Sequence, residues 1–103
     1  MNTLIQTHLS QLEQLCCEFR VKRLELIGSA RNDESFHPDT SDIDLLVEFQ
    51  PLPPLEHGRT YWKLWKALHN LFHRSVDLIE TQALKNPYFL ANIKHQREVL
   101  YEN

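Results

Sequence analysis

The stretch "GSARNDESFHPDTSDIDLLVEF", residues 28–49, places a Gly-Ser pair before a polar segment and two aspartates at the start of an apolar run. Along residues 42–49 apolar and polar side chains alternate, which predicts a strand with one buried face. Ile43 and every second residue after it belong to that buried face, so Asp42 and Asp44 project together from the other. Two carboxylates on one strand face repel each other unless a proton or a cation lies between them. The sequence therefore predicts a charged site at the beginning of a buried strand.

The sequence on either side predicts an α/β fold built on a mixed sheet. Steps of three and four residues between apolar side chains are typical of helices, and short alternating runs are typical of strands. Clusters of proline predict loops, whereas an Asn-Pro pair favours a helix start. In chain order the predicted elements are a helix over 3–19, a strand over 23–27, a turn into a helix after Gly28, the strand within 42–49, a loop over 50–58, a helix over 61–72, a strand over 75–80, a helix from 86 to about 95 and an edge strand in the tail.

Composition limits the classes of function. A chain of 103 residues with 42% apolar and 24% charged residues is long enough for one compact domain, residues 1–103, and too short for a second. The net charge of −3 disfavours nucleic acid as the main partner. The sequence has neither a signal-peptide pattern nor an apolar stretch of about 20 residues, so we expect a cytoplasmic protein with no membrane span. Cys16 and Cys17 are adjacent, which disfavours a structural disulfide.

A third acid, Asp77, lies in the run "SVDLIE", on the strand face opposite to Val76. Oxygen ligands suit Mg²⁺, which commonly bridges one or two carboxylates to substrate phosphates. Two such ions activate an attacking oxygen and stabilise a leaving pyrophosphate. We therefore predict that Asp42, Asp44 and Asp77 are metal ligands and catalytic residues, and that Asp77 accepts the proton.

The Gly-Ser pair predicts a phosphate site. Gly28 lets the backbone approach a ligand, and Ser29 with the amides after it offers hydrogen-bond donors to the β- and γ-phosphates. A P-loop is disfavoured, because no Lys-Ser or Lys-Thr pair follows a glycine at the required spacing. Alternatively, Gly28 and Ser29 form a purely structural turn and Asp42 and Asp44 mark a solvated strand end. Arg31 either steadies phosphates or is an exposed helix arginine.

The order of these motifs resembles a known family. Gly28-Ser29, twelve intervening residues, Asp42-Ile43-Asp44 and then Asp77 are similar to the minimal nucleotidyltransferases of the DNA polymerase β superfamily, in particular to the MNT antitoxins paired with HEPN ribonuclease toxins. The resemblance implies a palm-like mixed sheet flanked by helices, binding of Mg²⁺ and ATP, and transfer of AMP to a tyrosine of a HEPN toxin, which silences the toxin. It assigns the Gly-Ser pair to the nucleotide phosphates and the three aspartates to the metal.

Two other functions remain open. The protein either masks a toxin by stoichiometric binding without chemistry, or transfers a nucleotide to RNA or to a small hydroxylated molecule. Separately, His69 and His73 have a spacing that suits zinc, but no third ligand accompanies them. Trp62 and Trp65 either stack on an adenine or belong to the core. A small basic cluster is either a solvated face or a partner contact; it comprises Arg20, Lys22 and Arg23.

Overall fold

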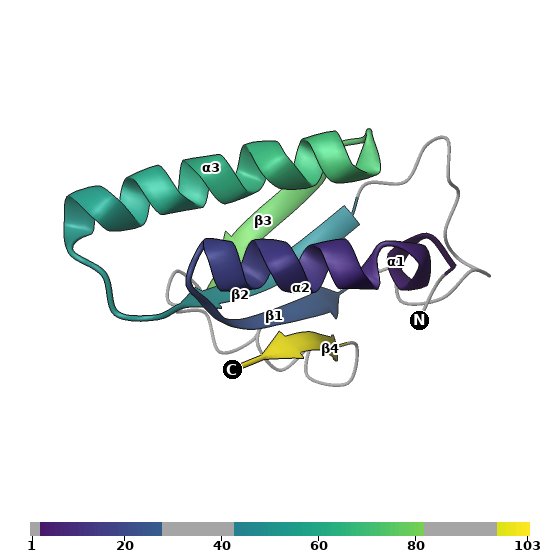
Figure 1. The fold of residues 1–103 in the computed structure, drawn as a ribbon, viewed down its shortest axis with the longest axis horizontal. Helices are drawn as coiled ribbons and strands as arrows, with labels where there is room; N and C mark the ends of the chain where they lie inside the picture. Colours follow the sequence, from purple (N-terminus) through teal and green to yellow (C-terminus); the bar gives the residue numbers. More distant parts are fainter. Residues whose placement is uncertain (1–2, 28–42, 82–96) are drawn as a thin grey trace, which may run out of the picture.

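The computed structural model describes residues 3–27, 43–81 and 97–103, and Figure 1 shows the helices and strands within these ranges. In chain order they are α1 (Thr3–Thr7), α2 (Leu9–Glu18), β1 (Val21–Ile27), β2 (Ile43–Phe49), α3 (Pro54–Phe72), β3 (Val76–Glu80) and β4 (Arg97–Glu102). No helix in these ranges is both long enough and apolar enough to cross a membrane. The helices predicted after Gly28 and over 86–95 lie outside the described residues.

The strands form one mixed sheet in the order β3-β2-β1-β4. Strand β2 runs parallel to β3, and β1 runs antiparallel to both of its neighbours, β2 and β4. Helices α2 and α3 lie side by side on the same face of the sheet (Figure 1). The mixed sheet is confirmed, and so is the edge strand predicted in the tail.

The main core fills the space between this sheet and its helices. Leu24 and Leu26 of β1, Leu45 of β2, and Leu64 and Leu68 of α3 are fully buried there. Burial of a leucine side chain contributes about 1.5–3 kcal/mol, so this layer is the principal source of stability. Because side chains alternate along a strand, the residues between these core positions, such as Asp44 of β2, project from the opposite face of the sheet, as the pattern in 42–49 predicts.

The predicted single helix over 3–19 is wrong at His8, where the chain divides into α1 and α2. The backbone of His8 has φ −106° and ψ 12°, outside the helical region. Its N–H donates to the carbonyl of Ile5, and its Nδ1 lies 2.9 Å from the carbonyl oxygen of Leu4. These local bonds replace one turn of the regular helical pattern. Apolar periodicity does not register such a break, because the same face continues on both sides.

The predicted loop over 50–58 is wrong from Pro54 onward, because α3 begins there. A proline at the first helical position loses no hydrogen bond, and its fixed φ suits a helix. The N–H of His57 donates to the carbonyl of Pro53 at 2.8 Å, which closes the first turn. At the other end His73 adopts the left-handed conformation with φ 52° and ends the helix. The prolines here start a helix, where composition alone favours a loop.

Strand β1 begins at Val21, two residues before the predicted start, and Val21 is fully buried. Arg20 precedes it with φ 58°, a left-handed turn between α2 and β1. The carbonyl of Arg20 accepts a hydrogen bond from the N–H of Gln50 at 2.9 Å. This bond ties the start of β1 to the residue that follows β2.

Candidate functional site

Two of the predicted acids lie next to each other at one end of the sheet. In the parallel register of β2 and β3, Asp44 is opposite Asp77. In the antiparallel register of β1 and β2, Asp44 is opposite Ile27, the last residue of β1. Residues opposite one another in a sheet project to the same side. The two carboxylates therefore share the face that points away from α2 and α3, as the sequence predicts.

This pair of acids has the chemistry of a site for a hard cation. Asp77 is exposed and Asp44 is partly buried, and neighbouring strands are about 4.8 Å apart. Like charges at that separation repel, and oxygen-ligated divalent cations relieve such repulsion. Within the described ranges no group of three or more acidic, histidine or cysteine side chains is placed to hold a metal. The pair fits such a cation, with Asp42 lying outside those ranges.

Gly28, Ser29, Arg31 and Asp42 all lie outside the described residues, so the structure brings together only Asp44 and Asp77 of the predicted site. The structure does describe the sequence neighbours of Gly28 and Asp42. Ile27 directly precedes Gly28, and Ile43 directly follows Asp42. Ile27 pairs with Asp44, and Ile43 pairs with Val76. Both neighbours therefore lie at the same end of the sheet as the two acids.

The pKa of Tyr61, a residue of α3 on the other side of the sheet, is affected by the charge of this site. Its hydroxyl donates to the carbonyl oxygen of Leu78 at 2.5 Å. Burial raises the pKa of Tyr61, and the negative charges of Glu80 and then Asp77 raise it further. The carboxylate of Glu80 also contacts Nε2 of His57. Tyr61 therefore remains protonated and fixes β3, which carries Asp77, against α3.

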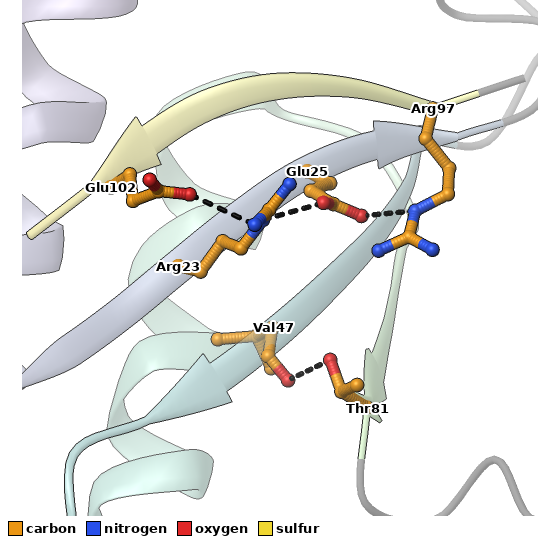
Figure 2. A network of polar contacts seen from close by, with 6 residues as sticks. All are labelled: Arg23, Glu25, Val47, Thr81, Arg97 and Glu102. Carbon is orange, nitrogen blue, oxygen red and sulfur yellow. Dashed lines mark hydrogen bonds and ion pairs between the residues drawn. The ribbon is translucent and has the colours of Figure 1, made fainter. Parts of the chain in front are cut away.

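A buried carboxylate on the same sheet face is a feature that sequence reasoning missed. Glu25 of β1 is only 2% exposed. Its Oε1 accepts from Nε of Arg23 at 2.6 Å and its Oε2 accepts from Nε of Arg97 at 2.5 Å (Figure 2). Arg23 also reaches Oε2 of Glu102 at 2.9 Å. A signal was present, because an acid two residues after Arg23 in "RLELI" shares its strand face.

The basic cluster of the sequence is largely occupied by such ion pairs. Lys22 lies 3.8 Å from Oε2 of Glu48, and Arg23 is held by the two carboxylates just described. On the other side of Figure 2, the hydroxyl of Thr81 donates to the carbonyl of Val47 at 3.3 Å and joins the end of β3 to β2. Lys22 and Arg23 of the cluster are thus paired with carboxylates of the sheet, and Arg20 is exposed.

The histidine and tryptophan candidates do not join the acids. Nε2 of His69 accepts the N–H of Val76 at 3.2 Å, and His73 ends α3, so the pair is not arranged as a zinc site. Trp65 packs against the main core, and Trp62 stacks on it with ring centroids 5.2 Å apart. Both tryptophans belong to α3, which packs on the sheet face opposite to the acids.

Both cysteines are free thiols. Cys16 is 1% exposed, and burial, followed by the charges of Cys17 and Glu13, raises its pKa to about 12. Cys17 is exposed and its Sγ lies 3.5 Å from the hydroxyl of Tyr101. Cys16 is therefore a core side chain, and Cys17 contacts β4 through Tyr101.

Two hollows among the described residues lie away from the acids. A groove of about 470 Å³ runs between α2 and α3 and is lined by residues such as Leu15 and Leu71. A second hollow of about 240 Å³ is lined by residues that include Lys22, Glu48 and His57, at the end of the sheet opposite to Asp44. Charge and ligand type decide where a cation binds, so the paired carboxylates, and not these hollows, have the chemistry of a cation site.

Comparison with known proteins gives the sequence relatives of this chain. The family model described as nucleotidyltransferase domain matches residues 9–100. A Methanocaldococcus jannaschii protein named as a candidate protein adenylyltransferase is 36% identical over 78 residues, which are 75% of this chain and 74% of that protein. Another protein of that organism, named in the same way, is 30% identical over 93 residues, 88% of this chain and 85% of its own length.

Solved structures share the fold. A structure described as a candidate minimal nucleotidyltransferase matches with a TM-score of 0.74 and 23% identity over 95% of each chain. A chain from the complex of a tri-AMPylated Shewanella oneidensis HEPN toxin with its MNT antitoxin matches with a TM-score of 0.63 and 18% identity, over 95% of this chain and 72% of that one. A toxin-antitoxin structure with AMP-PNP matches with a TM-score of 0.66 and 19% identity, over 92% and 73%. The expected palm-like arrangement of a mixed sheet and helices is confirmed.

Proposed function

The chain belongs to the nucleotidyltransferase domain family, and on that premise we propose that it is a Mg²⁺-dependent protein adenylyltransferase acting as an antitoxin. It transfers AMP from ATP to a tyrosine of a partner HEPN ribonuclease toxin, with residues 1–103 working as one domain. The observation that carries the proposal is the register that sets Asp44 beside Asp77, at the end of the sheet where β1 stops one residue before Gly28.

The acids supply the ligands and the base. Asp44 and Asp77, together with Asp42, would hold the divalent cation, which when bound neutralises the triphosphate and favours the oxyanion of the acceptor. Gly28 and Ser29 bind the β- and γ-phosphates. The acceptor hydroxyl oxygen forms a bond to the α-phosphorus as the bond from that phosphorus to the bridging oxygen breaks. Pyrophosphate leaves, and Asp77 takes the hydroxyl proton.

Two kinds of relative support the choice of acceptor. The sequence relatives from Methanocaldococcus jannaschii are named for transfer of an adenylyl group to protein. One solved neighbour is a complex whose HEPN toxin carries AMP groups, and another contains an ATP analogue.

The proposal is tested by incubating the full chain with α-labelled ATP, Mg²⁺ and the HEPN protein of the neighbouring gene. We expect label on a tyrosine of the partner, and loss of at least about 100-fold in rate for the Asp44→Asn, Asp77→Asn double variant. Glu48→Gln is the matched control, since Glu48 lies on the same face of the same strand as Asp44 and should label normally.

Three outcomes would overturn the proposal, each in a different way. If the double variant labels the partner as fast as the wild type, the acids are not catalytic. If it neutralises the toxin fully without labelling it, the protein acts by masking. If the label appears on added tRNA and not on the partner, the acceptor is RNA.

A further inference from the structure

Arg97 completes a row of four residues across the sheet. Asp77 of β3 is opposite Asp44 of β2, Asp44 is opposite Ile27 of β1, and Ile27 is opposite Arg97 of β4. All four lie on one face, with Arg97 two strands away from Asp44. Two strand spacings are about 10 Å between backbones, a gap that an arginine side chain and a ligand on Asp44 span together. The positively charged residue Arg97 therefore lies at the opposite end of the row from the paired acids.

The side chain of Arg97 starts in this row and crosses β1 to Glu25, two residues before Ile27. Figure 2 shows it leaving β4, lying across β1 and meeting Glu25 through Nε. Nε makes the bond to Oε2 of Glu25 at 2.5 Å. A guanidinium has five N–H donors, and Nε carries only one of them. Among residues 3–27, 43–81 and 97–103, Glu25 is the one side chain with which Arg97 forms an ion pair.

Glu25 holds two arginines, and they are not equivalent. Arg23, on the other carboxylate oxygen, turns its Nη1 to Glu102 at 2.9 Å, so both ends of its guanidinium have carboxylate partners. Arg23 also lies four residues before Ile27, away from the acid pair. Arg97 instead pairs with Ile27, the last residue of β1 before Gly28. Its side chain is 29% exposed, and its bond to Glu25 is made by Nε.

We propose that Arg97 is a phosphate-binding residue of the nucleotide site, which donates from its two terminal nitrogens to the triphosphate of the Mg²⁺-nucleotide. The planar guanidinium can donate to two phosphate oxygens at once. It also neutralises negative charge of the triphosphate that the Mg²⁺ ion does not neutralise. Glu25 is a positioning residue, because its bond to Nε fixes the plane of the fork. The inference rests on the proposed function and adds to it a residue outside the Gly-Ser and aspartate motifs.

The test measures the Kd of a non-hydrolysable ATP analogue for the full chain in Mg²⁺ by calorimetry. A charged hydrogen bond to phosphate corresponds to about a 10- to 100-fold loss of affinity when it is removed, so we expect that loss for Arg97→Ala. The Kd of AMP should change much less, since AMP lacks the β- and γ-phosphates. Arg23→Ala is the matched control, because it also removes one arginine from Glu25, and its Kd should stay within about threefold of the wild type.

Two further variants keep the test decisive if Arg97→Ala unfolds. Arg97→Lys keeps one positive charge but loses the fork, and we expect an intermediate loss of triphosphate affinity. Glu25→Gln keeps the shape of the carboxylate but not its charge. It should weaken the binding of the triphosphate analogue and leave the binding of AMP unchanged. A purely structural role would instead lower the melting temperature and leave the ratio of the two Kd values unchanged.

The outcomes separate this inference from the proposed function. Equal triphosphate Kd values for folded Arg97→Ala and Arg23→Ala would overturn the role of Arg97 alone. A selective loss in Arg97→Ala, with no labelling of any HEPN protein by the wild type, would support Arg97 and refute the acceptor. Absence of nucleotide binding by the wild type in Mg²⁺ would refute both.

Discussion

Replacing Asp77 with asparagine should make the metal-free protein more stable and the magnesium-loaded protein less stable than the wild type. The carboxylates of Asp44 and Asp77 project from opposite positions on neighbouring strands, whose backbones are about 4.8 Å apart. Coulomb repulsion at that distance is about 0.8 kcal/mol in water, and like charges facing each other in a sheet destabilise it by about 0.2–1 kcal/mol. Asp77→Asn removes this repulsion, so we expect about 0.5–1 kcal/mol of added stability in EDTA. For a chain of this length that is an increase in Tm of about 2–8 °C.

Magnesium should reverse the order. A ligand that binds only the folded protein adds about 2.7 kcal/mol at a concentration 100 times its Kd. The wild type gains this stabilisation and Asp77→Asn, which lacks one ligand, gains far less. The pKa of Tyr61 should also fall in the variant, because the charge of Asp77 is one of the causes that raise it. An ultraviolet titration of the tyrosines provides this second readout.

The assay is thermal unfolding in EDTA and in a series of Mg²⁺ concentrations, with Glu48→Gln as the control. Glu48 pairs with Lys22 at 3.8 Å, and Lys22 is exposed while Glu48 is partly exposed. Because such surface pairs contribute little, its loss should change stability by less than about 0.5 kcal/mol and leave the Mg²⁺ response intact. The reasoning is refuted if Asp77→Asn is the less stable protein in EDTA while the control is unaffected. Equal stabilisation of both proteins by Mg²⁺ would likewise show that Asp77 is not a ligand.

Three other outcomes follow from the core and its hydrogen bonds. Burial raises the pKa of Cys16 from 9.0 to about 12, so the folded thiol keeps a proton that the unfolded chain loses. The free energy of unfolding should therefore fall by about 1.4 kcal/mol per pH unit between about pH 9 and pH 12. Urea titrations at several pH values should show a shallower fall for Cys16→Ala. Leu45→Ala should cost about 2–5 kcal/mol in chemical denaturation, whereas Leu55→Ala, with 70% of Leu55 exposed, should cost almost nothing; equal losses would contradict the assigned core. Tyr61→Phe removes the bond to the carbonyl of Leu78 and should lower the unfolding free energy by about 1 kcal/mol, and an unchanged value would mean that the bond contributes nothing.

Local pattern predicted the strands of this fold better than its helices. Alternation in 42–49 and 75–80 identified β2 and β3 and assigned Asp44 and Asp77 to the face away from the core, because a strand's side chains alternate regardless of its neighbours. Helix ends were less predictable, since the break at His8 depends on local hydrogen bonds and the start at Pro54 depends on whether a proline occupies the first helical turn. The roles of Gly28, Ser29, Arg31 and Asp42 remain predictions from the motif alone.

The sequence by itself determined which side chains share a face, since that follows from the two-residue repeat of a strand. It also determined the family, because the spacing of Gly28-Ser29, Asp42-Ile43-Asp44 and Asp77 is a local property of the chain. Only the tertiary structure decided which strands are neighbours and in what register, and so placed Asp77 beside Asp44 and Arg97 in the same row. Register depends on how strands distant in sequence bury their apolar faces together, and no single segment contains that information.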